Sequence, residues 1–340
     1  MSSPVPQKSE LTRRQLLKVA LAGGALATSG FGILQWHQQP RMHASTFIGR
    51  ADTYDVDLRS ILASGFSELG VTSSEIRGKR ILLKPNLVET HVDSEHINTH
   101  PLVIRAAIEA FLELGASQVM VGEGPGHRRD TLEILEESGL AQVLYDDQIR
   151  FVDLNEGGGH TVYNQGSQTG LANLTFPAIF QEIDWVVSMA KLKTHHWAGV
   201  TLSMKNLFGV MPGMFYGWPK NVLHHVGIHE SILDISATLK PHFAIVDGIV
   251  GMEGDGPIMG TAKQAGVLVM GRNVTAVDAT CSRLMGINPH KVGYLATASN
   301  WLGPIHDSAI QQRGELLNPL RKDFFLLNQI PAHQGLRLHA

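Results

Sequence analysis

The sequence has almost no cysteine. Its 340 residues contain a single one, Cys281. One thiol excludes an internal disulfide, and it excludes an iron–sulfur cluster held by the usual four cysteines. Because Cys281 lies in a segment with helical character, residues 273–286, we predict that its side chain is buried and unreactive.

Two further shortages narrow the class of protein. Charged residues make up only 17% of the chain and the formal net charge is −3, so no basic surface indicates a nucleic acid partner. After residue 34 no apolar run reaches the roughly 18 residues that a membrane-crossing helix needs, so we expect no stable transmembrane span in the mature form. Hydrophobic residues at 43% are ample for a sizeable core.

The first 34 residues resemble an export signal. The stretch "TRRQLLK", residues 12–18, resembles the twin-arginine signature and precedes a modest apolar region broken by glycines. The resemblance implies folded export through the twin-arginine translocase, to the periplasm or another exported location, and favours a cofactor bound beforehand. An uncleaved signal would instead leave a membrane anchor. We predict a linker at 35–52 and an α/β domain at 53–330.

Strands and helices alternate along that domain. This alternation predicts a mostly parallel sheet with helices on both faces, together with a polar hairpin or polar loop excursion around 157–180. If the domain consists of two halves, we expect the boundary between them near residues 155–182. The predicted strands are 79–88, 117–122, 149–155, 183–190 and a short last one at 323–328; the predicted helices include 54–70, 100–115, 128–139 and one near 200–208.

Four of the predicted strands run into unusually polar segments. In open α/β sheets, ligands bind outside the carboxyl ends of the strands. The coincidence of several polar strand ends therefore predicts a ligand site at that edge. The four segments are 84–86, 122–127, 191–196 and 247–257.

Basic residues gather in the stretch "MAKLKTHHWAGVTLSMKNLFG", residues 189–209. If the strand stays extended, Lys191, Lys193 and His195 share one face within about 13 Å of chain. A helix near 200–208 would point Lys205 at the same place. We interpret the cluster as a clamp for phosphate or carboxylate, with His195 as acid, base or ligand. The alternative is a solvated basic loop.

A glycine loop follows the strand at 117–122. Gly122 and Gly124 would let a ligand approach the backbone closely, and the helix that follows offers free N–H groups to an anion. The spacing fits neither a P-loop nor a dinucleotide fingerprint. The alternative is a tight turn in which Glu123 has no role.

Three carboxylates follow the strand that ends near residue 247. Asp247, Glu253 and Asp255 are separated by glycines and carry oxygen ligands suited to a divalent metal ion. Two alternatives stay open: a solvated acidic loop, or pairing of Asp247 or Glu253 with the lysines of the basic stretch.

Several of these motifs together resemble the DUF362 family, a domain named for unknown function. They are "LLKPNLV", "GEG", "AKLKTHHWAGVTLSMKNLFGVMPG", "VDGIVGMEGDGPIMG" and "AVDATCSRLMG", and the resemblance covers roughly residues 80–320. Some relatives carry ferredoxin-like cysteine segments, which this chain lacks, so no cysteine-ligated iron–sulfur cluster is expected. By resemblance the motif positions are Lys84, Asn86, Lys191, Lys193, His195, Lys205, Asn206, Asp247, Glu253 and Asp278.

The sequence thus predicts an exported enzyme that acts on a small anionic ligand, with a divalent metal as a candidate cofactor. The predicted catalytic residues are His195, Lys193 and Lys205, and nearby lysines should lower the pKa of His195. The predicted ligand-binding residues are Lys84, Asn86, Gly122, Glu123, Gly124, Lys191 and Asn206, and the predicted metal ligands are Asp247, Glu253 and Asp255. The alternatives are a non-catalytic binding or cofactor-maturation protein, and a redox partner without its own cluster.

Overall fold

The computed structural model of this chain describes residues 42–90, 94–126, 130–299 and 301–338. The predicted export signal at 1–34 lies outside the described residues. It therefore stays a prediction, together with the translocase partner and the exported location. Within the described part of the chain, no helix combines the length and the apolar character that crossing a bilayer requires.

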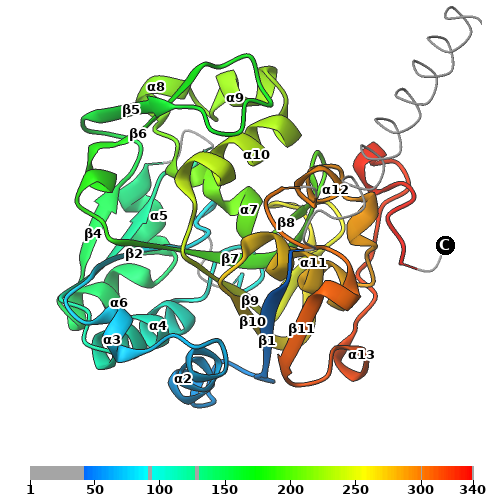
Figure 1. The fold of residues 1–340 in the computed structure, drawn as a ribbon, viewed down its shortest axis with the longest axis horizontal. Coiled ribbons are helices and arrows are strands. Elements are labelled where there is room, and N and C mark those ends of the chain that lie inside the picture. Colours follow the sequence, from blue (N-terminus) through cyan, green and yellow to red (C-terminus); the bar gives the residue numbers. More distant parts are fainter. Residues whose placement is uncertain (1–41, 91–93, 127–129, 300, 339–340) are drawn as a thin grey trace, which may run out of the picture. The chain divides into compact units, whose positions relative to one another are not determined.

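A nine-stranded sheet forms the centre of the fold, in the order β11-β1-β10-β9-β7-β2-β3-β4, with β8 paired to β7 (Figure 1). The neighbours from β9 to β4 are parallel, and β10 is antiparallel to both β9 and β1. The predicted α/β class with a mostly parallel sheet is therefore confirmed. The strands of this sheet are β1 (Ala44–Arg50), β2 (Arg80–Lys84), β3 (Gln118–Glu123), β4 (Arg150–Asp153), β7 (Trp185–His195), β8 (Gly199–Thr201), β9 (Phe243–Glu253), β10 (Thr261–Gly271) and β11 (Ile310–Gly314).

Helices cover both faces of this sheet (Figure 1). Short polar side chains begin several of them: Asp57 accepts a hydrogen bond from Ser60 N, and Asp130 accepts from Leu132 N and Glu133 N. The helices are α2 (Leu58–Glu68), α3 (Ser73–Ile76), α4 (Pro101–Glu113), α5 (Thr131–Glu137), α6 (Leu140–Asp146), α7 (Ser203–Asn206), α8 (Gly213–Tyr216), α9 (Asn221–His225), α10 (Ile228–Leu239), α11 (Val274–Leu284), α12 (Gly293–Ala298) and α13 (Leu317–Leu320).

The central strand β7 contributes to a hydrophobic core on each face of the sheet. Val187 and Met189 pack with α2, α4 and α6, whereas Ala190 and Leu192 pack with α7, α10 and α11. Residues two apart on a strand share a face, so a strand covered on both sides is apolar at almost every position. All of β7 is buried. The polar residues at its carboxyl end are buried as well, and they therefore need partners.

The segment at 157–180 forms a hairpin, one of the two forms that its sequence predicts. Strands β5 (Gly159–Tyr163) and β6 (Asn173–Pro177) pair antiparallel outside the main sheet. Asn164 Nδ2 donates to Asp234 Oδ2 of α10 at 2.6 Å, which fixes the hairpin to the rest of the fold. The described residues from 43 onward form one compact unit, and this unit is not divided near 155–182.

Three expectations about elements are wrong. The predicted linker at 35–52 contains β1, because that segment pairs with β10 and β11, which lie more than 200 residues away in the sequence. The predicted helix near 200–208 is split into β8, α7 and a 3₁₀ turn. Residues 323–328 form no strand; there Phe324 inserts its ring into the core. The prediction of a buried Cys281 is confirmed.

Candidate functional site

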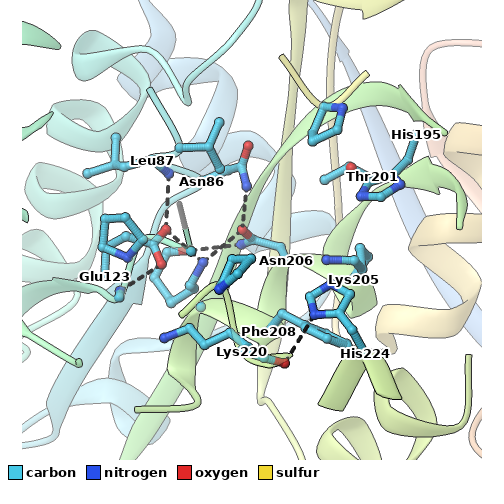
Figure 2. Close-up of a pocket in the computed structure, with 18 of the residues that line it drawn as sticks. Asn86, Leu87, Glu123, His195, Thr201, Lys205, Asn206, Phe208, Lys220 and His224 are labelled. Atoms are coloured by element: carbon cyan, nitrogen blue, oxygen red, sulfur yellow. Dashed lines mark hydrogen bonds and ion pairs between the residues drawn. The ribbon is translucent and has the colours of Figure 1, made fainter. Parts of the chain in front are cut away.

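A pocket of about 130 Å³ opens at the carboxyl ends of β2, β3 and β7 (Figure 2). Lys84, Glu123 and His195 are the last residues of these three strands, and parallel pairing brings them to one edge of the sheet. Segments from 195 to 224 form the other wall. The charged and polar lining side chains are Lys84, Asn86, Glu123, His195, His196, Thr201, Lys205, Asn206, Lys220 and His224.

A fully bonded network forms one wall of this pocket. Lys84 Nζ donates to Glu123 Oε2 at 2.7 Å, to Asn206 Oδ1 at 2.9 Å and to Pro85 O at 2.8 Å. Glu123 also accepts from the N–H groups of Leu87 and Gly124. Burial lowers the pKa of Lys84, while the adjacent Glu123 opposes that shift. All three donors of Lys84 are used, so this lysine positions the wall and has no donor left for a ligand.

His195 lies on the opposite wall with one ring nitrogen fixed. Its Nδ1 accepts hydrogen bonds from Trp197 N at 3.0 Å and Ala198 N at 3.2 Å. A backbone N–H can only donate, so Nδ1 carries no proton and the neutral ring carries its proton on Nε2. Burial, followed by the charge of Lys205, holds the pKa of His195 well below its usual value. The pKa of His195 is thus lowered, as expected from the sequence. The Nε2–H group remains available as a hydrogen-bond donor.

Two more polar groups beside His195 lack protein partners. Thr201 Oγ1 is buried, and no hydrogen bond reaches it from the described residues. Lys205 Nζ lies 4.1 Å from the centroid of the Phe208 ring, and within the described chain it donates to no acceptor. Figure 2 shows Thr201, Lys205 and His195 on the same side of the pocket. Asn86 Oδ1 is a further buried acceptor without a described partner.

The pKa values of the pocket lysines Lys205 and Lys220 are lowered from their usual value. The pKa of Lys205 falls to about 7, because burial disfavours its charge and Lys84 repels it, with Glu123 acting in the opposite direction. The pKa of Lys220 also falls to about 7, mainly through burial. Lys220 differs in its bonding, since its Nζ donates to Asn155 Oδ1 and Met211 O.

Lys191 and Lys193 belong to the same strand but do not line the pocket. Strand β7 extends through His195, as the alternation argument assumed, yet Tyr54 and the segment 97–100 cover the strand at Lys191 and Lys193. Lys191 Nζ bonds to Asp247 Oδ2 at 2.8 Å. Lys193 Nζ donates to Ile97 O at 2.8 Å and Pro257 O at 3.1 Å. Their place in the predicted anion clamp is therefore not supported by the geometry.

The three predicted metal ligands have three separate sets of partners. Asp247 is buried against Lys191, which matches the pairing alternative left open above. Glu253 Oε2 lies 3.0 Å from Lys263 Nζ, and Asp255 Oδ1 lies 3.3 Å from His196 Nδ1. Among the described residues, no three histidine, cysteine, aspartate or glutamate side chains gather as a group able to hold a metal ion.

Most of the other predicted site residues do meet at the pocket. Lys84, Asn86, Glu123, Gly124, His195, Lys205 and Asn206 all line it. Gly122 does not, because it faces Leu82 and Leu154 in the interior. Sequence reasoning missed Lys220, whose only signal is its place in the proline-containing stretch "GWPK". That stretch reaches the pocket through the folding of α8 and α9.

The close approach of Gly209 to the bonded wall gives a first test. Replacing Gly209 by alanine would place a Cβ atom against Glu123 Oε1 and Lys84 Nζ. We expect the free energy of unfolding to fall by about 1–3 kcal/mol, the usual effect of overpacking. Chemical denaturation measures it, with Gly170→Ala as the matched control, since nothing lies within 4 Å of a Cβ there. Equal effects of the two changes would contradict the contact.

Comparison with known proteins gives a family, a curated relative and distant likenesses to solved structures. Residues 81–283 match the family described as "Domain of unknown function (DUF362)". The thylakoid-associated protein sll1697 of a Synechocystis species is 27% identical over 263 residues, which cover 75% of this chain and 78% of that protein.

Two of the solved structures that resemble this chain are each 13% identical to it. The lactate racemase apoprotein from Thermoanaerobacterium thermosaccharolyticum has a TM-score of 0.41, covering 72% of this chain and 58% of that one. A protein from Thermotoga maritima has a TM-score of 0.38, covering 69% of this chain and 60% of that one. The chain thus spans about three fifths of the length of the two solved proteins.

Proposed function

Because this chain belongs to the DUF362 family, whose description names no reaction, we propose a function from the pocket itself: an enzyme that binds a small carboxylate- or phosphate-bearing ligand and exchanges a proton with it. The ligand would contact the wall formed by His195, Thr201 and Lys205. The opposite wall, built around Lys84 and Glu123, would hold that geometry fixed.

The observation that carries this proposal is the set of unused polar groups on one wall. His195 Nε2–H, Thr201 Oγ1 and Lys205 Nζ have no protein partners among the described residues. Thr201 Oγ1 is buried, and leaving a buried polar group unpaired is costly. Its position beside the unused His195 Nε2–H and Lys205 Nζ favours a ligand that pairs with all three groups. Two are donors and the third is a hydroxyl that can donate, a set that suits the oxygen atoms of an anion.

The charge of the lining supports the same ligand class. The charged lining side chains are Lys84, Lys205, Lys220 and Glu123, an excess of basic groups in a chain whose formal net charge is −3. Lys205 suits proton exchange because a group with a pKa of about 7 populates both protonation states at neutral pH. His195 would orient the ligand as a donor, since its free nitrogen already carries a proton.

This arrangement predicts how anion affinity depends on pH. Lys205 is an ammonium group below about pH 7 and a neutral amine above it. Affinity for acetate, whose own charge is constant in this range, should therefore be highest below pH 7 and fall as the pH rises through it. Isothermal titration calorimetry from about pH 6 to about pH 8.5 measures this. The other titratable groups that line the pocket are Lys84, Glu123, His195, His196, Lys220 and His224.

The matched control for this profile is the Lys205→Met variant. It should bind acetate more weakly and show a shallower pH dependence, with the remaining slope coming from Lys220. An affinity that rises with pH, or one that is constant in the wild-type protein, would contradict the proposal.

A further inference from the structure

One lysine of the pocket differs from the other two in its bonding. Lys84 is engaged by three acceptors and Lys220 by two, whereas Lys205 donates to none of the described residues. We propose that the Lys205 amine is a nucleophile that forms an imine with the carbonyl carbon of a small 2-oxo acid bound in the pocket. This inference rests on the proposed function, because the carboxylate of the 2-oxo acid is the anion that the pocket binds.

The surroundings of Lys205 favour attack by its nitrogen. Nζ lies 4.1 Å from the Phe208 ring centroid, and it faces the pocket with no carboxylate in contact with it. Lys205 is partly exposed toward the pocket and lies near the buried cation Lys84. Desolvation and a neighbouring cation both activate imine-forming lysines, because both favour the neutral form that carries the lone pair. The lowered pKa of Lys205 agrees with that geometry. Lys84 stays paired with Glu123 and lacks this freedom.

The remaining donors are suited to the carbonyl oxygen and the carboxylate. His195 Nε2–H and the Thr201 hydroxyl lie on the same wall and have no described partners. A hydrogen bond to a carbonyl oxygen stabilises the negative charge that develops there during attack. A second donor then remains for the carboxylate. A 2-oxo acid presents both groups on adjacent carbon atoms, which suits a pocket of about 130 Å³.

The reaction balances without an additional co-reactant. The lone pair of neutral Lys205 forms a C–N bond to the carbonyl carbon, while the C=O π electrons move to oxygen. Transfer of the nitrogen proton to that oxygen gives a neutral carbinolamine. Protonation of the hydroxyl by solvent then breaks the C–O bond and releases water. The product is the iminium ion of Lys205, and one proton has been taken up.

Reductive trapping tests this proposal. The protein is incubated with pyruvate, treated with sodium borohydride, and examined by intact mass spectrometry and peptide mapping. We expect one reduced pyruvyl adduct, located on Lys205. With pyruvate saturating at every pH, the trapping rate should rise as the pH increases from about 6 to about 8, although the affinity for the carboxylate falls over the same range. Lys205→Arg should abolish this adduct. The exposed Lys322→Arg is the matched control and should leave it unchanged.

Propionate separates this inference from the proposed function, because it is a carboxylate of similar size without a carbonyl carbon to attack. It should slow the trapping of pyruvate by competition and form no adduct. If calorimetry shows propionate binding that Lys205→Met weakens, but pyruvate gives no adduct on Lys205, the imine is overturned and the anion site stands. If neither ligand binds and no adduct forms, both proposals are overturned.

Discussion

Replacing Lys191 by methionine is expected to lower the free energy of unfolding by about 3–5 kcal/mol, because it leaves the carboxylate of Asp247 buried without its cation. Both side chains are fully buried, and Lys191 Nζ lies 2.8 Å from Asp247 Oδ2. Tyr54 Oη donates to Asp247 Oδ1 at 3.1 Å, and His100 N donates to Oδ2 at 3.0 Å. These neutral donors would remain in the variant but would not replace the lost charge.

Urea denaturation measures this effect, and a second ion pair provides the control. Lys263 pairs with Glu253 at 3.0 Å, but both side chains are partly exposed. Lys263→Met should therefore cost no more than about 1 kcal/mol, as expected for a solvent-screened pair. If Lys191→Met costs no more than Lys263→Met, the buried pair does not have the structural role assigned to it. Removing both charges, as in Lys191→Met with Asp247→Leu, should recover part of the loss.

Replacing Lys205 by methionine is expected to weaken acetate binding by about 10- to 100-fold below pH 7. A hydrogen bond to a charged group contributes about 1.5–3 kcal/mol, and each 1.4 kcal/mol changes an equilibrium constant tenfold. Because Lys205 has no described protein acceptor that its removal would leave unpaired, the free energy of unfolding should not fall. Binding loss without loss of stability is the signature of a ligand contact.

Calorimetry with acetate measures that loss, and chemical denaturation checks the stability. Lys322→Met is the control, since Lys322 is exposed and does not line the pocket. Unchanged acetate affinity in Lys205→Met would show that the ammonium group does not contact the anion.

The location of the pocket was predictable from the sequence. Lys84, Glu123 and His195 each end a strand that the apolar pattern predicts, and parallel strands bring their carboxyl ends to one edge. Local pattern and a single topological rule were sufficient for these three residues. Lys205 was assigned to the site through a predicted helix near 200–208, which the structure splits, and the family resemblance includes both Lys205 and Asn206; both line the pocket.

The partners of the lysines were not predictable in the same way. Lys191 and Lys193 alternate along the strand as residues of an exposed anion clamp would. They are nevertheless covered by Tyr54 and residues 97–100, which lie about 90 to 140 positions earlier in the sequence. Strand β1 was missed for a related reason, since its pairing partners lie near the other end of the chain. Contacts between residues so distant in sequence depend on tertiary packing, which local periodicity does not encode.

The central claim is that a small anion binds against His195 Nε2–H, Thr201 and Lys205. Nitrogen-15 NMR of the histidine side chains during titration with acetate tests it most directly, with His195→Gln used to assign the resonances. We predict that the His195 ring is neutral and protonated on Nε2. As acetate is added below pH 7, the Nε2 resonance should move, whereas the chemical shift of Nδ1 should stay at the value of an unprotonated nitrogen that accepts hydrogen bonds. An Nε2 resonance that stays in place while acetate binds elsewhere, or a ring protonated on Nδ1, would contradict the account.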